Sequence, residues 1–338
     1  MADAYVEPTM KAIVQDEYGL ADQVLRVEET DTPAVGAGEV LVRVHAAGLD
    51  RGVWHSVAGL PYPIRLVSGM RTPKIRVPGL EVAGRVAAVG AGVTSLRTGD
   101  DVFGIGAGSF AEYVSCRQDK LAPMPPSLSF EQAAMVPVSG STALQAIRDR
   151  GRVRSGHRVL IIGASGGVGT FAVQIGKVFG AEVTAVCSTA KVDLVRSLGA
   201  DDVIDYTRSD FADGRKRYHV ILDIGGNTSL RRLRRALTPR GRLVIVGGET
   251  SGRWLGGTDR QLRALAISPF VGQQLGSFVA STNREDLIVL GRLIEAGHLK
   301  PVLDRTFPLA AAAEAIRYLE QGRARGKVVI TIDGADRG

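Results

Sequence analysis

The stretch LIIGASGGVGTFAVQIGK at residues 160–177 decides the fold. It begins with an apolar run typical of a buried strand, continues through four closely spaced glycines, and ends with helical spacing. A phosphate binds where backbone N–H groups at a helix N-terminus are approached without an intervening Cβ. The motif therefore predicts the phosphate-binding turn of a dinucleotide in a Rossmann domain, with a glycine-rich turn that binds nothing as the alternative. The predicted contacts are Gly163, Ser165, Gly166, Gly167, Val168 and Gly169.

Strands and helices alternate around this turn, from residue 129 to residue 298. Near-continuous apolar runs, such as AEVTAVCS at 181–188 and YHVILDIGG at 218–226, are separated by segments with helical periodicity. This order predicts a doubly wound parallel sheet with helices on both faces. Ser129 is the expected N-cap of the first helix.

Residues 10 to about 125 have a different character, with short β-prone runs separated by Gly- and Pro-rich turns. The run KVVITI at 327–332 is also β-prone, and we expect it to pair with these N-terminal strands. We therefore predict an α/β protein of two domains. Residues 1–128 and 299–338 form a β-rich domain, and residues 129–298 form the Rossmann domain.

The composition excludes several classes of protein. The chain has 338 residues, 45% hydrophobic and 23% charged, which is enough for two cores. Two cysteines, Cys116 and Cys187, cannot build a disulfide framework or a four-thiolate zinc site. No apolar run is long enough for a membrane span, and the acidic start MADAYVEPT is unlike a signal peptide, so we expect a cytoplasmic protein.

The net charge of +7 is spread over the chain. Its densest run, SLRRLRRAL at 229–237, places arginines on the outer face of a helix, which is a solvated surface or a contact for an anion. No basic stripe is interleaved with aromatic residues, so the sequence argues against a nucleic-acid partner.

The strand at 181–188 ends without the acidic residue that NAD-selective sites use to bind the ribose 2′-hydroxyl. Ser188, Thr189 and Lys191 stand there instead, and hydroxyls and an ammonium bind a 2′-phosphate. The sequence therefore predicts NADP(H), although an ordinary exposed helix position remains the alternative for Lys191. Tyr206 is either a further wall of this pocket or a core residue.

The chain resembles the zinc-free quinone oxidoreductase branch of the medium-chain dehydrogenase/reductase superfamily. The resemblance covers nearly the whole chain, and it implies a GroES-like catalytic domain, a Rossmann domain and an active site in the cleft between them. It also implies a homodimer, with QLGSFVAST at 274–282 as a candidate edge strand at the two-fold axis. The motifs that carry it include GEVLVRVHAAGLDRGVWH, VPGLEVAGRVAAVGAGVTSLRTGDDVFG, SFEQAAMVPVSGSTALQAI, GASGGVG, SLGADDVIDY and GKVVI.

Zinc members of this superfamily hold the catalytic metal with Cys, His and Cys. The matching positions here are Asp50, Leu80 and Pro137–Ser139, and the four cysteines of a structural zinc site are absent. Leucine cannot bind a metal, so we expect no zinc. Alcohol oxidation needs a Lewis acid, whereas a quinone or an enone accepts hydride at a conjugated position and spreads the charge. We therefore predict a zinc-independent, NADPH-dependent reductase of a small quinone or α,β-unsaturated carbonyl.

The resemblance also implies site residues. Asp50, His55 and Tyr62 are the candidate catalytic residues, and packing is the alternative for His55. Two other functions stay open: an enoyl reductase that tailors a larger substrate, with residues 61–78 shaping its cleft, and a non-catalytic NADPH-binding or RNA-binding protein. The further residues implied to bind the cofactor are Thr142, Gly225, Val246, Gly247, Phe270 and Val271.

Overall fold

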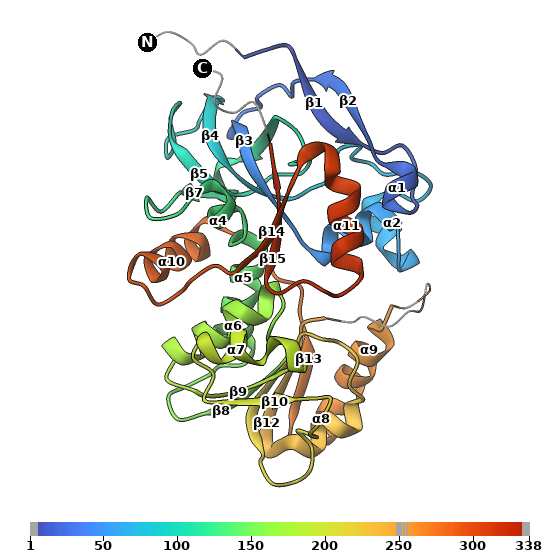
Figure 1. Ribbon diagram of the computed structural model, residues 1–338, viewed down its shortest axis with the longest axis vertical. Coiled ribbons are helices and arrows are strands. Elements are labelled where there is room, and N and C mark those ends of the chain that lie inside the picture. The colour runs from blue at the N-terminus through green and yellow to red at the C-terminus, as the bar shows by residue number, and fades with distance from the viewer. Residues whose placement is uncertain (1–5, 248–251, 253, 255, 333–338) are drawn as a thin grey trace. The chain divides into compact units, whose positions relative to one another are not determined.

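The structure is a computed structural model that describes residues 6–247, 252, 254 and 256–332 (Figure 1). The chain divides into two compact units. The first contains the described residues of Met1–Ser141, Thr282–Gly297 and Pro301–Gly338. The second contains those of Thr142–Ser281 and His298–Lys300.

The second unit is built on a parallel sheet of six strands in the order β10-β9-β8-β11-β12-β13. Its central strands are mostly apolar and buried, because helices cover both faces of the sheet: α6 and α7 on one and α8 and α9 on the other (Figure 1). This is the predicted doubly wound fold. The strands are β8 (Arg158–Ile162), β9 (Glu182–Cys187), β10 (Asp202–Asp205), β11 (Tyr218–Asp223), β12 (Leu237–Ile245) and β13 (Gln274–Ser277). The helices are α6 (Gly167–Val178), α7 (Val192–Ser197), α8 (Leu230–Ala236) and α9 (Thr258–Ile267).

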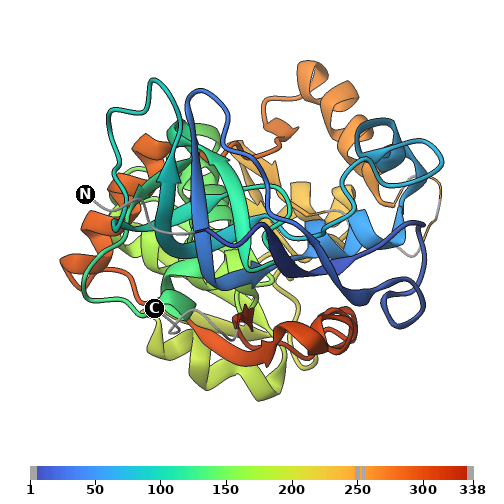
Figure 2. The ribbon, with the colours of Figure 1, turned by 90° about the horizontal axis from the view of Figure 1, so that it is seen from above.

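The first unit is a mixed sheet in the order β14-β15-β3-β4-β5-β7, with β6 also paired to β3. The predicted return of the C-terminal run is confirmed, because Val328 of β15 pairs antiparallel with Leu49 of β3. A separate antiparallel pair, β1 and β2, is drawn in dark blue in Figure 2. The strands are β1 (Thr9–Val14), β2 (Arg26–Asp31), β3 (Glu39–Leu49), β4 (Glu81–Val89), β5 (Asp101–Ile105), β6 (Tyr113–Arg117), β7 (Leu121–Pro123), β14 (Leu303–Pro308) and β15 (Lys327–Thr331).

Helices also interrupt this β-rich unit, and those between residues 21 and 68 lie where the strand pattern did not indicate any. The clearest case is α2, which begins where the Oδ1 of Asp50 accepts a hydrogen bond from the N–H of Val53, at 3.1 Å. An Asp at the N-cap is a strong start signal for a helix. The helices are α1 (Ala21–Val24), α2 (Arg51–Ala58), α3 (Arg65–Ser68), α4 (Phe130–Ala134), α5 (Pro137–Gln145, which extends into the second unit), α10 (Arg284–Glu295) and α11 (Ala312–Glu320).

The boundary of the units differs from the expected one. Ser129 caps α4 as predicted, in a capping box with Gln132, but residues 129–141 and 282–297 pack with the first unit. Two long-range hydrogen bonds tie the segment containing α10 to β7 and its neighbourhood: Arg284 Nη1 donates to the Leu121 carbonyl at 2.9 Å, and Lys120 Nζ to the Thr282 carbonyl at 2.8 Å. Among the described residues, no helix has the length and apolar character that crossing a membrane requires.

Candidate cofactor and active site

The predicted phosphate turn connects β8 to α6. Two of its glycines are required by close packing: a Cβ on Gly169 would lie 2.2 Å from the Gly163 carbonyl oxygen, and Gly163 has φ +84°. Gly166 is different, because a Cβ there would come no closer than 3.7 Å to any atom outside its neighbours in the chain. Gly166 is the N-cap of α6, and no side chain caps the helix. The α6 N-terminus thus has no side-chain cap and open space beside Gly166, as a phosphate site requires.

The carboxyl ends of β8, β11 and β12 meet beside this turn. The N–H of Gly225 donates to the Ile162 carbonyl at 3.1 Å, and the N–H groups of Val246 and Gly247 donate to the Asp223 carbonyl at 3.0 and 3.2 Å. The structure therefore brings Gly225, Val246 and Gly247 to the sheet edge where ligands bind in this architecture. Thr142 is buried on α5, and Ser165 is buried within the phosphate turn.

The residues after β9 contain a feature that the sequence argument missed. Thr189 Oγ1 donates to Asp205 Oδ2 at 2.5 Å, because Asp205 ends the neighbouring strand β10 in register with Cys187. The hydrogen bonds from Thr189 and Thr207 lower the pKa of Asp205, so this carboxylate is ionised at neutral pH. The predicted 2′-phosphate pocket of Ser188, Thr189 and Lys191 thus has an acidic neighbour. The acid could have been found by inspecting the end of the next strand.

Tyr206 is 61% exposed, which excludes the core-packing alternative. Its backbone N–H donates to the Cys187 carbonyl at 3.1 Å, so the residue lies beside the end of β9. Both cysteines are buried, and burial raises the pKa of each thiol, so neither is an activated nucleophile.

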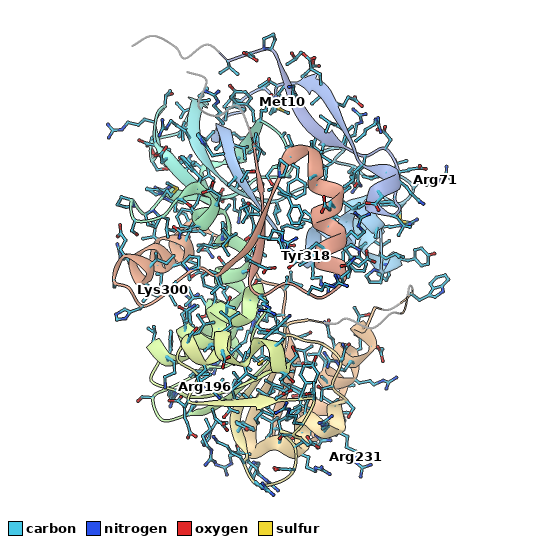
Figure 3. All side chains as sticks on the ribbon, viewed as in Figure 1. Met10, Arg71, Arg196, Arg231, Lys300 and Tyr318 are labelled. Carbon is cyan, nitrogen blue, oxygen red and sulfur yellow. The ribbon has the colours of Figure 1, made fainter. Side chains whose placement is uncertain are left out.

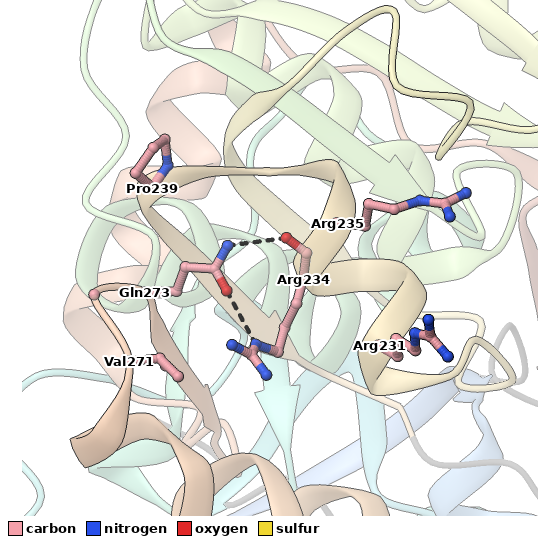
Figure 4. Close-up of a pocket in the computed structure, with 7 residues that line it drawn as sticks. Arg231, Arg234, Arg235, Pro239, Val271 and Gln273 are labelled. Carbon is pink, nitrogen blue, oxygen red and sulfur yellow. Dashed lines mark hydrogen bonds between the residues drawn. The ribbon is translucent and has the colours of Figure 1, made fainter.

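Phe270 and Val271 lie at the other end of the sheet. They precede β13, which runs parallel to β12, so they stand at the amino edge, opposite the phosphate turn. Val271 lines a surface hollow with Arg231 and Gln273, where Arg234 Nε donates to Gln273 Oε1 at 3.1 Å (Figure 4). We therefore correct the prediction that Phe270 and Val271 lie beside the nicotinamide. The carboxyl end of β13 is Ser277, and Phe278 and Val279 follow it in the chain. Ligands bind where parallel strands end, so this rule points to the residues after β13 and not to those before it.

The three candidate catalytic residues come from one stretch of the first unit: Asp50 is the N-cap of α2, His55 lies in α2, and Tyr62 lies in the turn that follows. The Oδ2 atom of Asp50 is buried without a hydrogen-bond partner. His55 Nδ1 lies 2.6 Å from the Leu60 carbonyl oxygen, which can only accept, so Nδ1 carries the proton. The Nε2 atom takes no part in this hydrogen bond. Tyr62 begins a short 3-10 turn, with the Arg65 guanidinium 5.1 Å from its ring centre.

A buried ion pair, absent from the sequence prediction, lies beside Asp50. Glu81 of β4 is fully buried and accepts from Lys327 of β15 and from the Val138 N–H, the latter at 2.8 Å. Burial raises the pKa of Glu81 to about 7, and the charge of Asp50 adds to the rise, which places Asp50 near the pair. Leu80 and Val138 are thus neighbours of a salt bridge. In the part of the chain that the structure describes, no three His, Cys, Asp or Glu side chains gather as metal ligands would.

Known proteins match this chain over most of its length. Residues 36–126 match the alcohol dehydrogenase GroES-like domain, and residues 198–330 match the zinc-binding dehydrogenase family. The chain is 33% identical to the 2-methylene-furan-3-one reductase of Solanum lycopersicum, over 95% of this chain and 79% of that protein. It is 34% identical to the chloroplastic NADPH-dependent alkenal/one oxidoreductase of Arabidopsis thaliana, over 97% and 81%. The chain belongs to the medium-chain dehydrogenase/reductase superfamily.

Within the superfamily it is a member of the quinone oxidoreductase-like branch. The quinone oxidoreductase of Coxiella burnetii has the same fold, with a TM-score of 0.84 and 28% identity over 96% of this chain and 99% of that one. The GroES-like and Rossmann folds expected from the sequence are therefore confirmed. Leu80, one of the positions matched to the zinc ligands of other superfamily members, has no side-chain atom that can bind a metal, and its neighbour Glu81 is paired with Lys327.

Proposed function

We propose that the protein transfers a hydride from NADPH to the conjugated carbon of an enone or quinone without using zinc. The observation that carries the proposal is the set of side chains around Asp50. Leu80 offers no donor atom, Glu81 is committed to Lys327 and to the Val138 N–H, and Asp50 alone makes a poor zinc ligand set. Reduction of a carbonyl that is not conjugated places the new negative charge on one oxygen, which a metal ion stabilises in the zinc enzymes, whereas an enone spreads that charge over its conjugated system.

The chain binds NADP(H) through the second unit. The uncapped α6 N-terminus at Gly166 fits the diphosphate, and Ser188, Thr189 and Lys191 are proposed to bind the 2′-phosphate, with Tyr206 beside them. The cofactor supplies the hydride. The names of the two plant relatives support this proposal, since one is an NADPH-dependent alkenal/one oxidoreductase and the other reduces an exocyclic methylene next to a ketone.

The residues of the first unit have separate proposed roles in the reaction. Hydride addition at the β-carbon leaves an enolate, which takes one proton at the α-carbon, so that an enone, NADPH and a proton give the saturated ketone and NADP⁺. The Tyr62 hydroxyl is proposed to donate a hydrogen bond to the developing oxyanion. His55 holds one proton at Nδ1 against Leu60, so its Nε2 is free to exchange another with the substrate or solvent.

The test is NADPH oxidation by the purified protein after exhaustive treatment with a chelator. We expect that chelator treatment changes neither the rate of enone reduction nor the rate of benzoquinone reduction. The saturated ketone that matches the enone should not be reduced before or after treatment. Reduction of the saturated ketone that stops on chelation and returns with zinc would overturn the proposal. So would a chelated protein that oxidises NADPH with neither the enone nor the quinone.

A larger, apolar enoyl substrate is the second candidate. The segment 61–78 exposes several apolar side chains, and exposed apolar groups close together in sequence indicate a contact surface. A screen that lengthens the acyl chain of the enone tests this: KM falling with chain length supports it, and a constant KM contradicts it. The exposed residues are Leu66, Val67, Met70 and Ile75.

We further propose that the protein is a cytoplasmic homodimer that pairs through β13. This strand is the last in the order of the second sheet, so its outer edge has no partner among the described strands. Light scattering coupled to gel filtration gives the mass directly. Twice the chain mass of 35.8 kDa supports the dimer, and a single chain mass contradicts it.

A further inference from the structure

We propose that Arg260 positions the loops that hold the nicotinamide half of the cofactor, an inference that rests on the proposed NADP(H) binding. Arg260 lies in the first turn of α9 and is only 11% exposed. Its guanidinium donates to the Asp223 carboxylate, to the Thr228 carbonyl at 2.8 Å and to the Gly247 carbonyl at 3.0 Å. One side chain thus joins the end of β11, the loop after it and the loop after β12.

The carboxylate at the centre of this arrangement has no contact with solvent. Asp223 is fully buried, and its Oδ1 also accepts from the Gly226 N–H at 3.3 Å. A buried ion pair is retained at a cost in desolvation unless several hydrogen bonds satisfy it. Here the bonds satisfy main-chain groups of two loops, which indicates that the pair fixes loop geometry.

The two loops are packed backbone against backbone. A Cβ on Gly247 would lie 2.2 Å from the Ile224 carbonyl oxygen, so no side chain at position 247 can hold the loops together. The Asp223 carbonyl and the Arg260 guanidinium instead bind Gly247 from its N–H and its carbonyl side. Loss of the guanidinium would release the Gly247 carbonyl and leave the Asp223 carboxylate buried without its cation.

The strand order assigns these loops to one half of the dinucleotide. The proposed 2′-phosphate residues follow β9, on one side of β8, whereas β11 and β12 lie on the other side. A dinucleotide that places its diphosphate at the end of β8 spans this edge, with adenosine over β9 and nicotinamide over β11 and β12. The loops that Arg260 holds are therefore at the nicotinamide half.

The experiment compares two ligands by titration calorimetry. NADPH contacts both halves of the site, and 2′,5′-ADP contacts only the adenosine half. We expect Arg260→Gln to raise the Kd of NADPH by about tenfold, the effect of losing charge-assisted hydrogen bonds, while the Kd of 2′,5′-ADP stays the same. The matched control is Arg263→Gln on the same helix, whose partner Asp259 is on the surface. This control should bind both ligands as the wild type does.

Arg260→Lys provides the second variant, because it keeps the positive charge but lacks the fork that reaches three acceptors. Its Kd for NADPH should lie between those of the wild type and Arg260→Gln. It replaces Arg260→Gln in the comparison of the two ligands if Arg260→Gln unfolds below the assay temperature. An equal rise of both Kd values, or no rise in either, overturns the role of Arg260. A wild-type protein that binds neither ligand overturns the proposed cofactor, and the inference with it.

Discussion

Lys327 and Glu81 form an ion pair in the interior of the first unit, where their side chains are 3% and 0% exposed. They lie 246 positions apart in the sequence and meet because β15 and β4 pair on either side of β3. Removing one partner leaves the other charge buried and unpaired, which is costly, whereas removing both replaces the pair by apolar packing.

Replacement of Lys327 alone should therefore destabilise the protein more than replacement of both partners. We expect Lys327→Met to lower the free energy of unfolding by about 3–5 kcal/mol, and Lys327→Met combined with Glu81→Leu to recover a substantial part of that loss. Urea denaturation of the two variants and the wild type measures both values. A double variant less stable than Lys327→Met would contradict this account of the pair.

The pair should also make stability depend on pH. The pKa of Glu81 is raised from 4.5 to about 7 in the folded protein, so the folded state binds its proton more tightly than the unfolded chain does. Stability from this group is full below pH 4.5 and is lost as the pH rises through about 7. In that window, the unfolding free energy of the wild type should fall relative to Glu81→Gln, by up to about 1.4 kcal/mol per pH unit. Parallel pH profiles for the two proteins would show that the shift is absent.

The glycines of the phosphate turn should separate folding from binding. Gly169→Ala places a Cβ 2.2 Å from a backbone oxygen and should cost about 1–3 kcal/mol of stability. Gly166→Ala meets no atom within 3.4 Å, so its melting temperature should match the wild type, but its methyl group enters the phosphate position and should weaken NADPH binding. Calorimetric melting and NADPH titration measure the two effects. Unchanged NADPH affinity in Gly166→Ala is the result that would place the phosphate elsewhere.

The choice of NADPH over NADH should depend on Lys191. Lys191→Glu should raise the Kd of NADPH tenfold or more and leave that of NADH nearly unchanged, since only NADPH carries the 2′-phosphate. Arg196→Glu is the control for a change of charge: Arg196 lies at the surface on the following helix, α7, and is labelled in Figure 3. Fluorescence titration of each variant with NADPH and with NADH measures these Kd values. If Arg196→Glu affects NADPH as much as Lys191→Glu does, the effect belongs to the net charge and not to a 2′-phosphate pocket.

Local signals predicted much of this structure. The phosphate turn, the alternating strands and helices around it and the Ser129 cap each depend on a few neighbouring residues. The β-prone run at 327–332 correctly predicted a strand. What the sequence could not show arises from contacts between distant segments. The carboxylate of Asp205 reaches Thr189 only because β10 pairs with β9, and Lys327 meets Glu81 only through the order of the first sheet.

The boundary between the units also depends on contacts between distant segments. Helical periodicity placed α10 with the alternating strands and helices before it in the chain, but Arg284 hydrogen-bonds to Leu121 in the first unit. The misplaced Phe270 and Val271 have another cause, since a motif resemblance identified the loop before β13 when parallel strands present ligands at their carboxyl ends.

The proposed reaction delivers hydride to a conjugated carbon and not to a carbonyl carbon. The most direct measurement uses NADPH deuterated at C4, in both diastereomers, with an acyclic enone and the chelator-treated protein, and locates the deuterium in the product by NMR. We predict deuterium at the β-carbon of the saturated ketone from one diastereomer only. Deuterium on the carbinol carbon of an allylic alcohol would show that hydride reaches the carbonyl carbon instead.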